Sequence, residues 1–467
     1  MAIAFDVSER WGSKGGYREF LFIAFPLILS TGSWSVQHFV DRMFLSWYSS
    51  EAIAAAMPAG ALNFTIISLF LGTCSYVNIF VAQYYGAGRF DRIGPSLWQG
   101  IYLSILGSII LISFAPFSEV IFRVVGHDTL VQEYEVEYFR ILCLGGGFII
   151  ASSALSGFFS GRGKSWPVMW VNVFATLLNI ILDYILIFGK WGMPELGMKG
   201  AALATVSSGL FSFIVFLFLI SSERYNNKYH TLKGWRFDKI LFPNLLRFGF
   251  PAGVQFLLDM AGFTIFILLV GRLGTTSLAA TSIAFNISTL TFMPMIGAGI
   301  AASVLVGQYL GRDMPDLAQK SVYSGFHLTF AYMAGFSIAY VIVPDIFIIP
   351  FAAHADSVRF AEIYEIAVIL LRFVAIYSIF DTMNIVFVSA IKGAGDTRFV
   401  MIMLLFISSF LLVIPTYLII VVFNRGIMFC WIIFSIYVSA LGFVFYLRFL
   451  GGKWKSMSVI EKGVKII

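Results

Sequence analysis

Twelve stretches of this chain are long and apolar enough to cross a lipid bilayer as helices. They fall at about 19–47, 53–84, 95–116, 137–160, 166–189, 198–221, 243–271, 277–309, 320–344, 361–390, 399–423 and 427–450. One helical crossing needs about 20 predominantly apolar residues. Backbone polar groups in hydrocarbon must be satisfied within the segment, which favours helices. The sequence therefore predicts an all-α integral membrane protein with twelve transmembrane helices.

Composition excludes most soluble functions. The chain is 59% hydrophobic and 12% charged, whereas soluble proteins have about 25% charged residues. The net charge of +6 arises in loops and termini, so it indicates membrane topology and no nucleic-acid partner. The sequence shows no metal-ligand spacing, phosphate-binding loop or nucleophile–base motif. We expect no cofactor, no resident metal and no enzyme activity.

The two halves of the chain repeat each other. One constant shift along the sequence, without a gap, pairs Phe25-Pro26 with Phe250-Pro251, Gly72 with Gly297, and Gln83-Tyr84 with Gln308-Tyr309. Six spans per half, starting on the same side, make a parallel repeat of the kind found in carriers. The fold class expected is two pseudo-symmetric six-helix lobes: an N-terminal lobe at 1–221, a cytoplasmic linker at 222–242, and a C-terminal lobe with a basic cytoplasmic tail at 243–467.

Loop charges predict the orientation of the chain. One side of the membrane has most of the basic residues, which include Arg89, Arg92, Arg162, Lys164, Arg224, Lys228, Lys233, Arg236, Lys239, Arg312, Lys392 and Arg398. Both termini are also basic, and the acidic segment Asp128–Glu137 falls on the other side. The positive-inside rule then places both termini and the linker in the cytoplasm, with the chain in the cytoplasmic (inner) membrane.

Four carboxylates interrupt the apolar spans: Asp41, Asp183, Asp259 and Asp381. Each follows a polar or aromatic residue by four positions, namely Gln37, Asn179, Gln255 and Tyr377. Four residues return to the same face of a helix. A charge in the bilayer core costs roughly 3 kcal/mol on insertion scales. Four such charges indicate a transport function.

In the first lobe, the candidate coupling site comprises Asp41, Asn179, Asp183 and Thr205. Two carboxylates, an amide and a hydroxyl suit Na⁺ or a shared proton. The alternative for Asp41 is a pair with Arg42 or His38, or a hydrated position near the membrane surface. The alternative for Asp183 is that it caps a broken helix or forms a hydrogen bond to it.

In the second lobe, Asp259, Tyr377 and Asp381 form a candidate site for a cation or a cationic drug, because a tyrosine ring adds a cation–π surface. The alternative for Asp381 is a buried acid bonded to Asn384. Pro26 and Pro251 fall at matched positions in spans one and seven, where proline bends a helix. These bends are either gating hinges or static kinks.

Several motifs together resemble the multidrug and toxic compound extrusion (MATE) family, and the resemblance covers nearly the whole chain. They are HFVDRMFL at 38–45, VAQYYGAGR at 81–89, SGRGKSWP at 160–167, NIILDYILIFG at 179–189, GAALAT at 200–205, VGQYLGR at 306–312 and IKGAGDT at 391–397. The family's NorM-like branch often has Glu where this chain has Asp259.

The resemblance implies a cation-coupled antiporter that expels organic cations by alternating access. It places ion coupling on Asp41, Asn179, Asp183 and Thr205, and a second site on Asp259, Tyr377 and Asp381. Monomer is the expected state. The oxygen-rich first site favours Na⁺, with H⁺ as the other candidate.

The alternatives are a flippase for lipid-linked oligosaccharide or peptidoglycan precursors, a membrane-embedded enzyme, and a channel. A flippase for anionic cargo should have several basic residues within its spans, and here the charges within the spans are mainly acidic.

Overall fold

The computed structural model describes residues 7–125, 128–351 and 357–461, and within these residues the regular structure is helical. Twelve helical segments there are long and apolar enough to cross a membrane. This number and the predicted span positions are confirmed. The basic tail predicted as far as residue 467 is described only to residue 461, so Lys462 and Lys465 lie outside the described residues.

The α-helices are α1 (Val7–Gly12), α2 (Tyr17–Tyr48), α3 (Ser50–Ser75), α4 (Val77–Gly86), α5 (Ile93–Phe114), α6 (Ser118–Val125), α7 (Thr129–Gly161), α8 (Trp166–Phe188), α9 (Met198–Ile220), α10 (Glu223–Tyr229), α11 (Leu241–Gly271), α12 (Thr275–Gly311), α13 (Pro315–Ile342), α14 (Pro344–Ile348), α15 (Ser357–Ala394), α16 (Thr397–Ile407), α17 (Ile414–Tyr417) and α18 (Ile427–Leu450). Short 3₁₀ or π-helical turns extend several of them. The eleventh span is π-helical at Ser408–Val413 and Leu418–Val422, on both sides of α17. Pro415 in α17 cannot donate a backbone hydrogen bond there.

The start of the fourth span differs from the sequence-based expectation. The acidic segment Asp128–Glu137, expected outside the membrane as a connection, forms the first two turns of α7 from Thr129 onward. Glutamates lower the hydropathy of a segment, but they are good helix formers. The helix therefore begins before the apolar run, while the position of the acidic segment outside the membrane stays a prediction.

Contacts divide the chain into two units. The C-terminal unit contains Met1–Ile28, Leu258–Leu310 and Met314–Ser458, and the N-terminal unit contains Leu29–Leu257, Gly311–Asp313 and Val459–Ile467. Helices α2 and α11 each contribute residues to both units.

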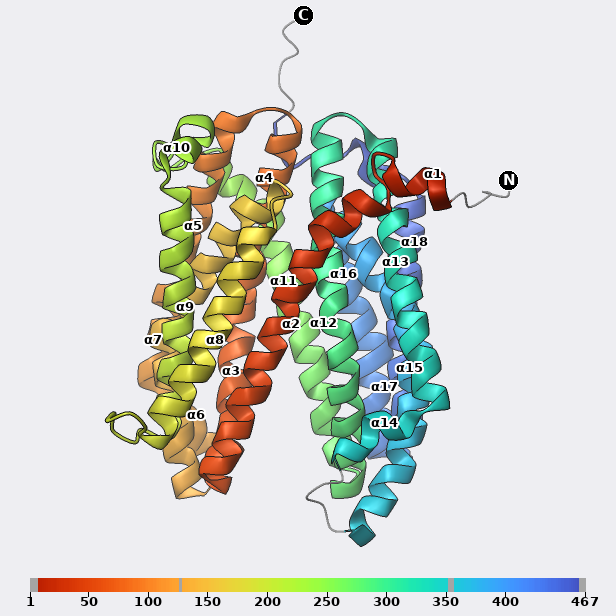
Figure 1. The fold of residues 1–467 in the computed structure, drawn as a ribbon. Helices are drawn as coiled ribbons and strands as arrows, with labels where there is room; N and C mark the ends of the chain where they lie inside the picture. The colour runs from red at the N-terminus through yellow and green to blue at the C-terminus, as the bar shows by residue number, and fades with distance from the viewer. Residues whose placement is uncertain (1–6, 126–127, 352–356, 462–467) are drawn as a thin grey trace, which may run out of the picture. The chain divides into compact units, whose positions relative to one another are not determined.

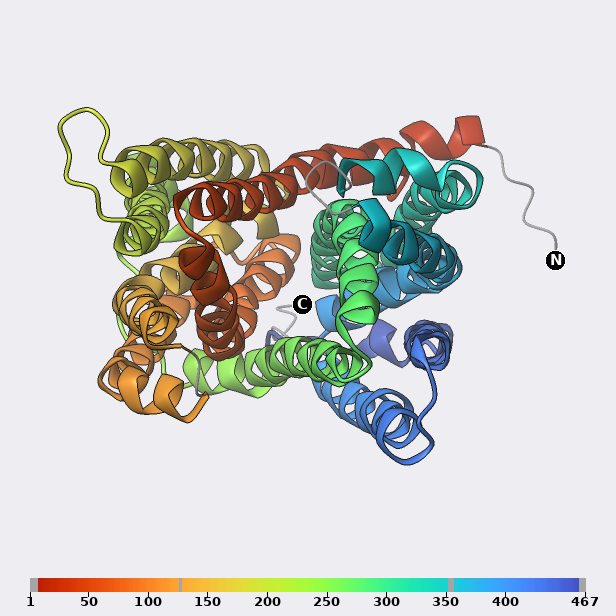
Figure 2. The ribbon, with the colours of Figure 1, turned by 90° about the horizontal axis from the view of Figure 1, so that it is seen from below.

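In the N-terminal unit, α7 is the central helix, because it packs against α3, α4, α5 and α9, while α8 packs against α9. These helices run roughly parallel, with α6 and α10 at opposite ends of the bundle (Figures 1 and 2). Alanines of α3 and α9 and aromatic residues of α2 and α7 form a buried core. Small residues at helix contacts allow the close packing that stabilises helices in lipid. In the C-terminal unit, α15 packs against both α13 and α18.

Equivalent glycine contacts confirm the internal repeat. In the N-terminal unit, a methyl group on Gly72 of α3 would lie 2.7 Å from the Cα of Gly253 in α11. In the C-terminal unit, a methyl group on Gly297 of α12 would lie 2.6 Å from the nitrogen of Ile28 in α2. The shift that pairs Gly72 with Gly297 also pairs Ile28 with Gly253. The two units therefore use the same backbone-to-backbone packing.

Gly72→Ala is expected to destabilise the protein by about 1–3 kcal/mol, because the added methyl overpacks a contact between two backbones. The control is Gly32→Ala, in α2 of the same unit, where nothing lies within 4 Å of the added atom. Thermal unfolding of both purified variants in one detergent measures the difference. Equal stability of the two variants would contradict this packing.

A second pair of repeated residues binds acids from the chain ends. In the N-terminal unit, the Tyr84 hydroxyl donates to Glu461 Oε2 over 3.5 Å. In the C-terminal unit, the Tyr309 hydroxyl donates to Glu19 Oε2 over 2.7 Å. The tyrosines are related by the repeat, and the glutamates are not.

Pro26 lies within α2 and Pro251 within α11, as expected from their matched positions. Each leaves a carbonyl of its helix without the usual intrahelical donor. Their role as gating hinges stays a prediction.

Candidate functional site

The first candidate site lies within the N-terminal unit, between α2 and α8. Asp41 comes from the last third of α2, and Asn179 and Asp183 lie one turn apart on α8. Asp41 is 7% exposed, and the other two are fully buried. The apolar residues around them in both helices form spans, so three polar side chains here face the protein interior.

Asn179 joins the two carboxylates. With its amide nitrogen directed toward them, Nδ2 donates to Asp41 Oδ1 over 2.9 Å and to Asp183 Oδ2 over 3.1 Å. The two carboxyl groups also interact directly with each other. The sequence-based prediction that Asp41, Asn179 and Asp183 converge is therefore met by the geometry.

This site has spare acceptor capacity. Asp183 Oδ1 is buried and accepts no hydrogen bond from the residues that the structure describes. An unsatisfied buried carboxylate oxygen costs free energy, which a proton or a small cation would recover. The donor set therefore fits H⁺ or Na⁺ as a transported ion.

The remaining residues near Asp41 have weaker connections to it. Thr205 on α9 is half-buried, and its carbonyl accepts a hydrogen bond from Ser208 over 2.8 Å; its place in the ion site stays a prediction. Arg42 and His38 are exposed, and neither forms an ion pair with Asp41 within the described part of the chain. Gln37, one turn before Asp41, is buried.

The second candidate site lies within the C-terminal unit. On α15, Asn384 Nδ2 donates to Asp381 Oδ1 over 3.0 Å, the hydrogen bond expected of a buried structural acid. Tyr377, one turn earlier, is buried, and its hydroxyl lies 3.2 Å from Ser288 Oγ of α12. Tyr377 and Asp381 interact electrostatically.

Aromatic rings surround Tyr377. Its ring centroid lies 5.3 Å from that of Phe434 and 6.5 Å from that of Trp431, both on α18. Phe285 of α12 stacks on Trp431 with centroids 4.9 Å apart. Ring faces beside a carboxylate are the surface that binds organic cations.

Asp259 on α11 belongs to the same unit and is half-buried. It interacts electrostatically with Lys392 and with Tyr437 of α18, and Tyr437 also interacts with Asp381. Lys392, assigned from the charge pattern to a cytoplasmic loop, lies instead in the last turn of α15. Asp259 therefore has a cationic partner within its own unit.

Comparison with known proteins identifies the family. A family model described as MatE matches residues 26–185 and 251–419, and the second match begins at the residue that the repeat pairs with the start of the first. The chain belongs to the MatE family. It is a membrane transporter and not an enzyme.

Named relatives cover most of this MATE protein. It is 29% identical to a probable multidrug resistance protein NorM of Bradyrhizobium diazoefficiens, over 81% of each chain. It is 25% identical to a probable multidrug resistance protein NorM of Thermotoga maritima, over 90% of this chain and 89% of that one. The solved structure of a MOP superfamily transporter from Pyrococcus furiosus has the same fold, with a TM-score of 0.86, 20% identity, and coverage of 98% of this chain and 100% of that one.

Sequence reasoning missed two tyrosines beside the candidate acids of this MATE protein, and one further buried carboxylate on α7. Tyr138 on α7 is buried within electrostatic range of both Asp41 and Asp183. Tyr437 has the same relation to Asp259 and Asp381. Glu135 is a further buried carboxylate on α7, in the acidic segment before the apolar run of that span. The tyrosines gave no local signal because their partners are on other helices. Glu135 could have been found by extending the predicted helix toward Thr129, because it lies three residues before Tyr138 and therefore on the same helical face.

The Lys392–Asp259 interaction predicts a measurable coupling energy in this MATE protein. Lys392→Met removes the cation beside Asp259, and Asp259→Asn removes the anion, so each single change leaves one charge in an apolar bundle. The double variant should be more stable than the sum of the two losses by roughly 0.5–3 kcal/mol. Thermal unfolding of all four proteins measures this, and strict additivity would exclude the interaction.

Proposed function

We propose that this protein is a multidrug efflux antiporter that exports organic cations in exchange for inward-moving H⁺ or Na⁺. The observation behind the proposal is the buried Asp41–Asn179–Asp183 cluster, in which one carboxylate oxygen lacks a hydrogen-bond donor among the described residues. The NorM names of the relatives from Bradyrhizobium and Thermotoga support multidrug transport.

The coupling ion is proposed to bind this cluster. Two carboxylates that share one site hold a single proton between them, so the arrangement with Nδ2 of Asn179 facing both acids favours H⁺. Na⁺ prefers oxygen ligands, and would need Asn179 to turn its amide oxygen toward Asp41 and Asp183. Thr205 then would add a hydroxyl oxygen.

The drug is proposed to use the second cluster. The Asp381 carboxylate supplies negative charge, and Tyr377 with the neighbouring rings of α18 supplies apolar and π surface. Lys392 limits the attraction of Asp259 for a cation, because it already interacts with that carboxylate. We therefore assign the drug's charge to Asp381 first.

Coupling follows from competition for negative charge. With the carboxylates ionised, a cationic drug is attracted; with H⁺ or Na⁺ bound, the attraction is lost and the drug leaves. Such antiport needs a coupling free energy between the two ligands and an exchange between inward- and outward-open states. We place both termini in the cytoplasm, in the inner membrane, and propose that the monomer is the working unit.

Efflux driven by each gradient separately tests the proposal. Purified protein is reconstituted into liposomes, and ethidium transport is followed under a proton gradient at equal Na⁺, then under a Na⁺ gradient at equal pH. Transport driven by one gradient and abolished by its collapse is the expected result. Failure of both gradients to drive any organic cation would refute antiport.

A further inference from the structure

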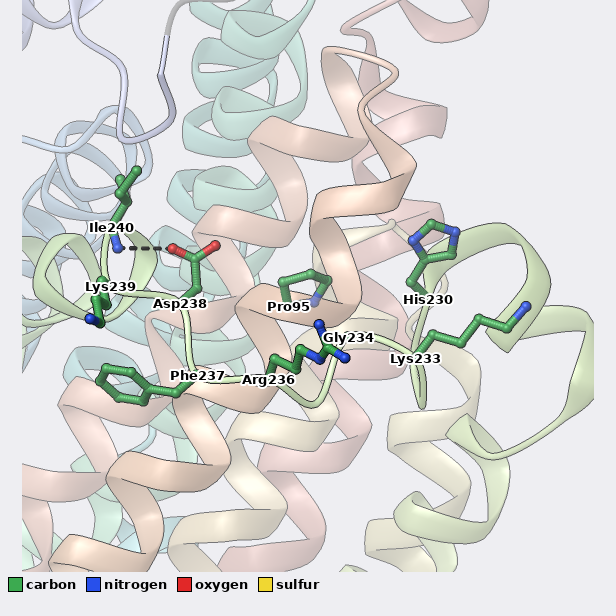
Figure 3. Close-up of a pocket in the computed structure, with 9 residues that line it drawn as sticks. All are labelled: Pro95, His230, Lys233, Gly234, Arg236, Phe237, Asp238, Lys239 and Ile240. Atoms are coloured by element: carbon green, nitrogen blue, oxygen red, sulfur yellow. Dashed lines mark hydrogen bonds between the residues drawn. The ribbon is translucent and has the colours of Figure 1, made fainter.

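The linker between the two halves of the chain forms a basic pocket at one end of α5. The pocket encloses about 460 Å³ and is lined by Pro95 of α5 and by the linker residues His230, Lys233, Arg236, Asp238 and Lys239, among others. Figure 3 shows these side chains spread along the linker backbone, with Arg236 beside Pro95. All of them belong to the N-terminal unit.

The linker backbone is fixed to α5. Trp98 Nε1 donates to the carbonyl of Thr231 over 2.7 Å, and the Tyr102 hydroxyl donates to the carbonyl of Trp235. Gln99 binds the linker on both sides of Phe237, since Nε2 donates to the Arg236 carbonyl over 3.4 Å and Oε1 accepts from the Asp238 nitrogen over 3.3 Å. These bonds use backbone groups, so the linker's basic side chains stay available.

The single acid of the pocket is already engaged. Asp238 forms an ion pair with Arg92 over 3.1 Å, and its Oδ1 accepts from the nitrogens of Ile240 and Leu241 at the start of α11. Burial alone would raise the pKa of Asp238, but these backbone donors and Arg92 outweigh it and lower that pKa. The carboxylate is therefore ionised near neutral pH and paired with Arg92.

Three cations of the pocket lack such partners within the described part of the chain. Lys233, Arg236 and Lys239 are exposed, and none of them forms an ion pair with another residue that the structure describes. With Asp238 paired, the pocket has a net positive charge. It is suited to an anion.

Exposed apolar side chains alternate with these cations. Trp235 is 59% exposed, Phe237 55% and Ile240 60%. The α11 span begins at Leu241, directly after them. Aromatic rings and basic side chains together at the end of a span are typical of the membrane–water interface, where rings enter the headgroup layer and cations meet lipid phosphates.

We propose that this pocket binds the phosphate headgroup of an anionic phospholipid, with Lys233, Arg236 and Lys239 supplying the positive charge along the linker and Trp235 and Phe237 lying in the headgroup layer. The site lies on the side that the positive-inside rule assigns to the cytoplasm, where anionic lipids attract basic residues. It is independent of the ion-coupling and drug sites.

Native mass spectrometry of the purified full-length protein tests this assignment. The protein is mixed with equal amounts of phosphatidylglycerol and phosphatidylcholine of the same acyl chains, and the bound lipids are counted. Lys233→Gln/Arg236→Gln/Lys239→Gln should lower the preference for phosphatidylglycerol by about tenfold or more, since each basic residue near an anionic surface contributes a factor of about five.

A matched control removes three exposed cations from the same predicted side: Lys164→Gln/Arg224→Gln/Arg398→Gln. It should keep the preference for phosphatidylglycerol. An equal loss in both triple variants, or no loss in the variant of Lys233, Arg236 and Lys239, would overturn the proposal. Inorganic phosphate in place of lipid, assayed by thermal stabilisation in neutral detergent, should not match phosphatidylglycerol; equal stabilisation would show a soluble-anion site instead.

Discussion

Replacing Asp41 by asparagine is expected to abolish ion-driven drug efflux while the protein stays folded. The change removes one of the two carboxylates that Asn179 joins, and an amide can neither release a proton nor neutralise a cation. Coupling between ion and drug is then lost, and efflux in liposomes should fall by about tenfold or more. Asparagine has nearly the same shape, so the unfolding temperature should change little.

Asp91→Asn is the matched control for this experiment. Asp91 is an exposed acid of the same unit, in the 3₁₀ turn Phe90–Arg92 before α5, and its loss should leave efflux unchanged. If the Asp41→Asn protein transports drug at the normal rate under an imposed gradient, then this carboxylate has no role in coupling. Loss of transport in both variants would indicate a general charge effect.

Asn179→Leu is expected to have the second-largest effect. Leucine fills a similar volume but removes the donor of two hydrogen bonds to carboxylates, at 2.9 and 3.1 Å. Bonds to charged groups contribute about 2 kcal/mol each, and two neighbouring acids without a donor repel each other. We expect lower thermal stability at neutral pH and loss of efflux, with stability partly recovered where a proton or Na⁺ binds between the acids.

Asn172→Leu separates this effect from general damage to α8. Asn172 lies about two turns earlier on the same helix, and its Nδ2 donates to the uncharged Ser30 hydroxyl over 2.6 Å. Its loss should cost about 1 kcal/mol, with efflux retained. Equal loss of stability in the two variants, with no rescue of Asn179→Leu by low pH or Na⁺, would contradict the role of Asn179 between the carboxylates.

The spans could be predicted from sequence because membrane crossing depends on local hydropathy. All twelve appear where apolar runs indicated them, and the internal repeat reappears in the Gly72 and Gly297 contacts. The helical structure of 129–136 was not predicted for the same reason: its glutamates lower hydropathy, although the segment is part of α7 and its Glu135 is buried.

The site was predictable only in part. Asp183 follows Asn179 by one helical turn, so the spacing predicted that the two share a helix face. Asp41 was a candidate for the same site because it is a charged residue within a span. Tyr138 and the Lys392–Asp259 interaction depend on which helices meet, and helix contacts leave no periodic signal in a single sequence. Lys392 was assigned to a loop for a related reason: the sequence does not distinguish a lysine at the end of a helix from one in the loop that follows.

The acids bound to Tyr84 and Tyr309 show that the two halves are no longer interchangeable. The repeat relates the two tyrosines, but Tyr309 binds Glu19 of the first span and Tyr84 binds Glu461, which follows the last span. A protein assembled from two copies of the first half would contain Glu19 twice and nothing in place of Glu461. Each repeated tyrosine therefore relies on an acid that the repeat itself does not supply.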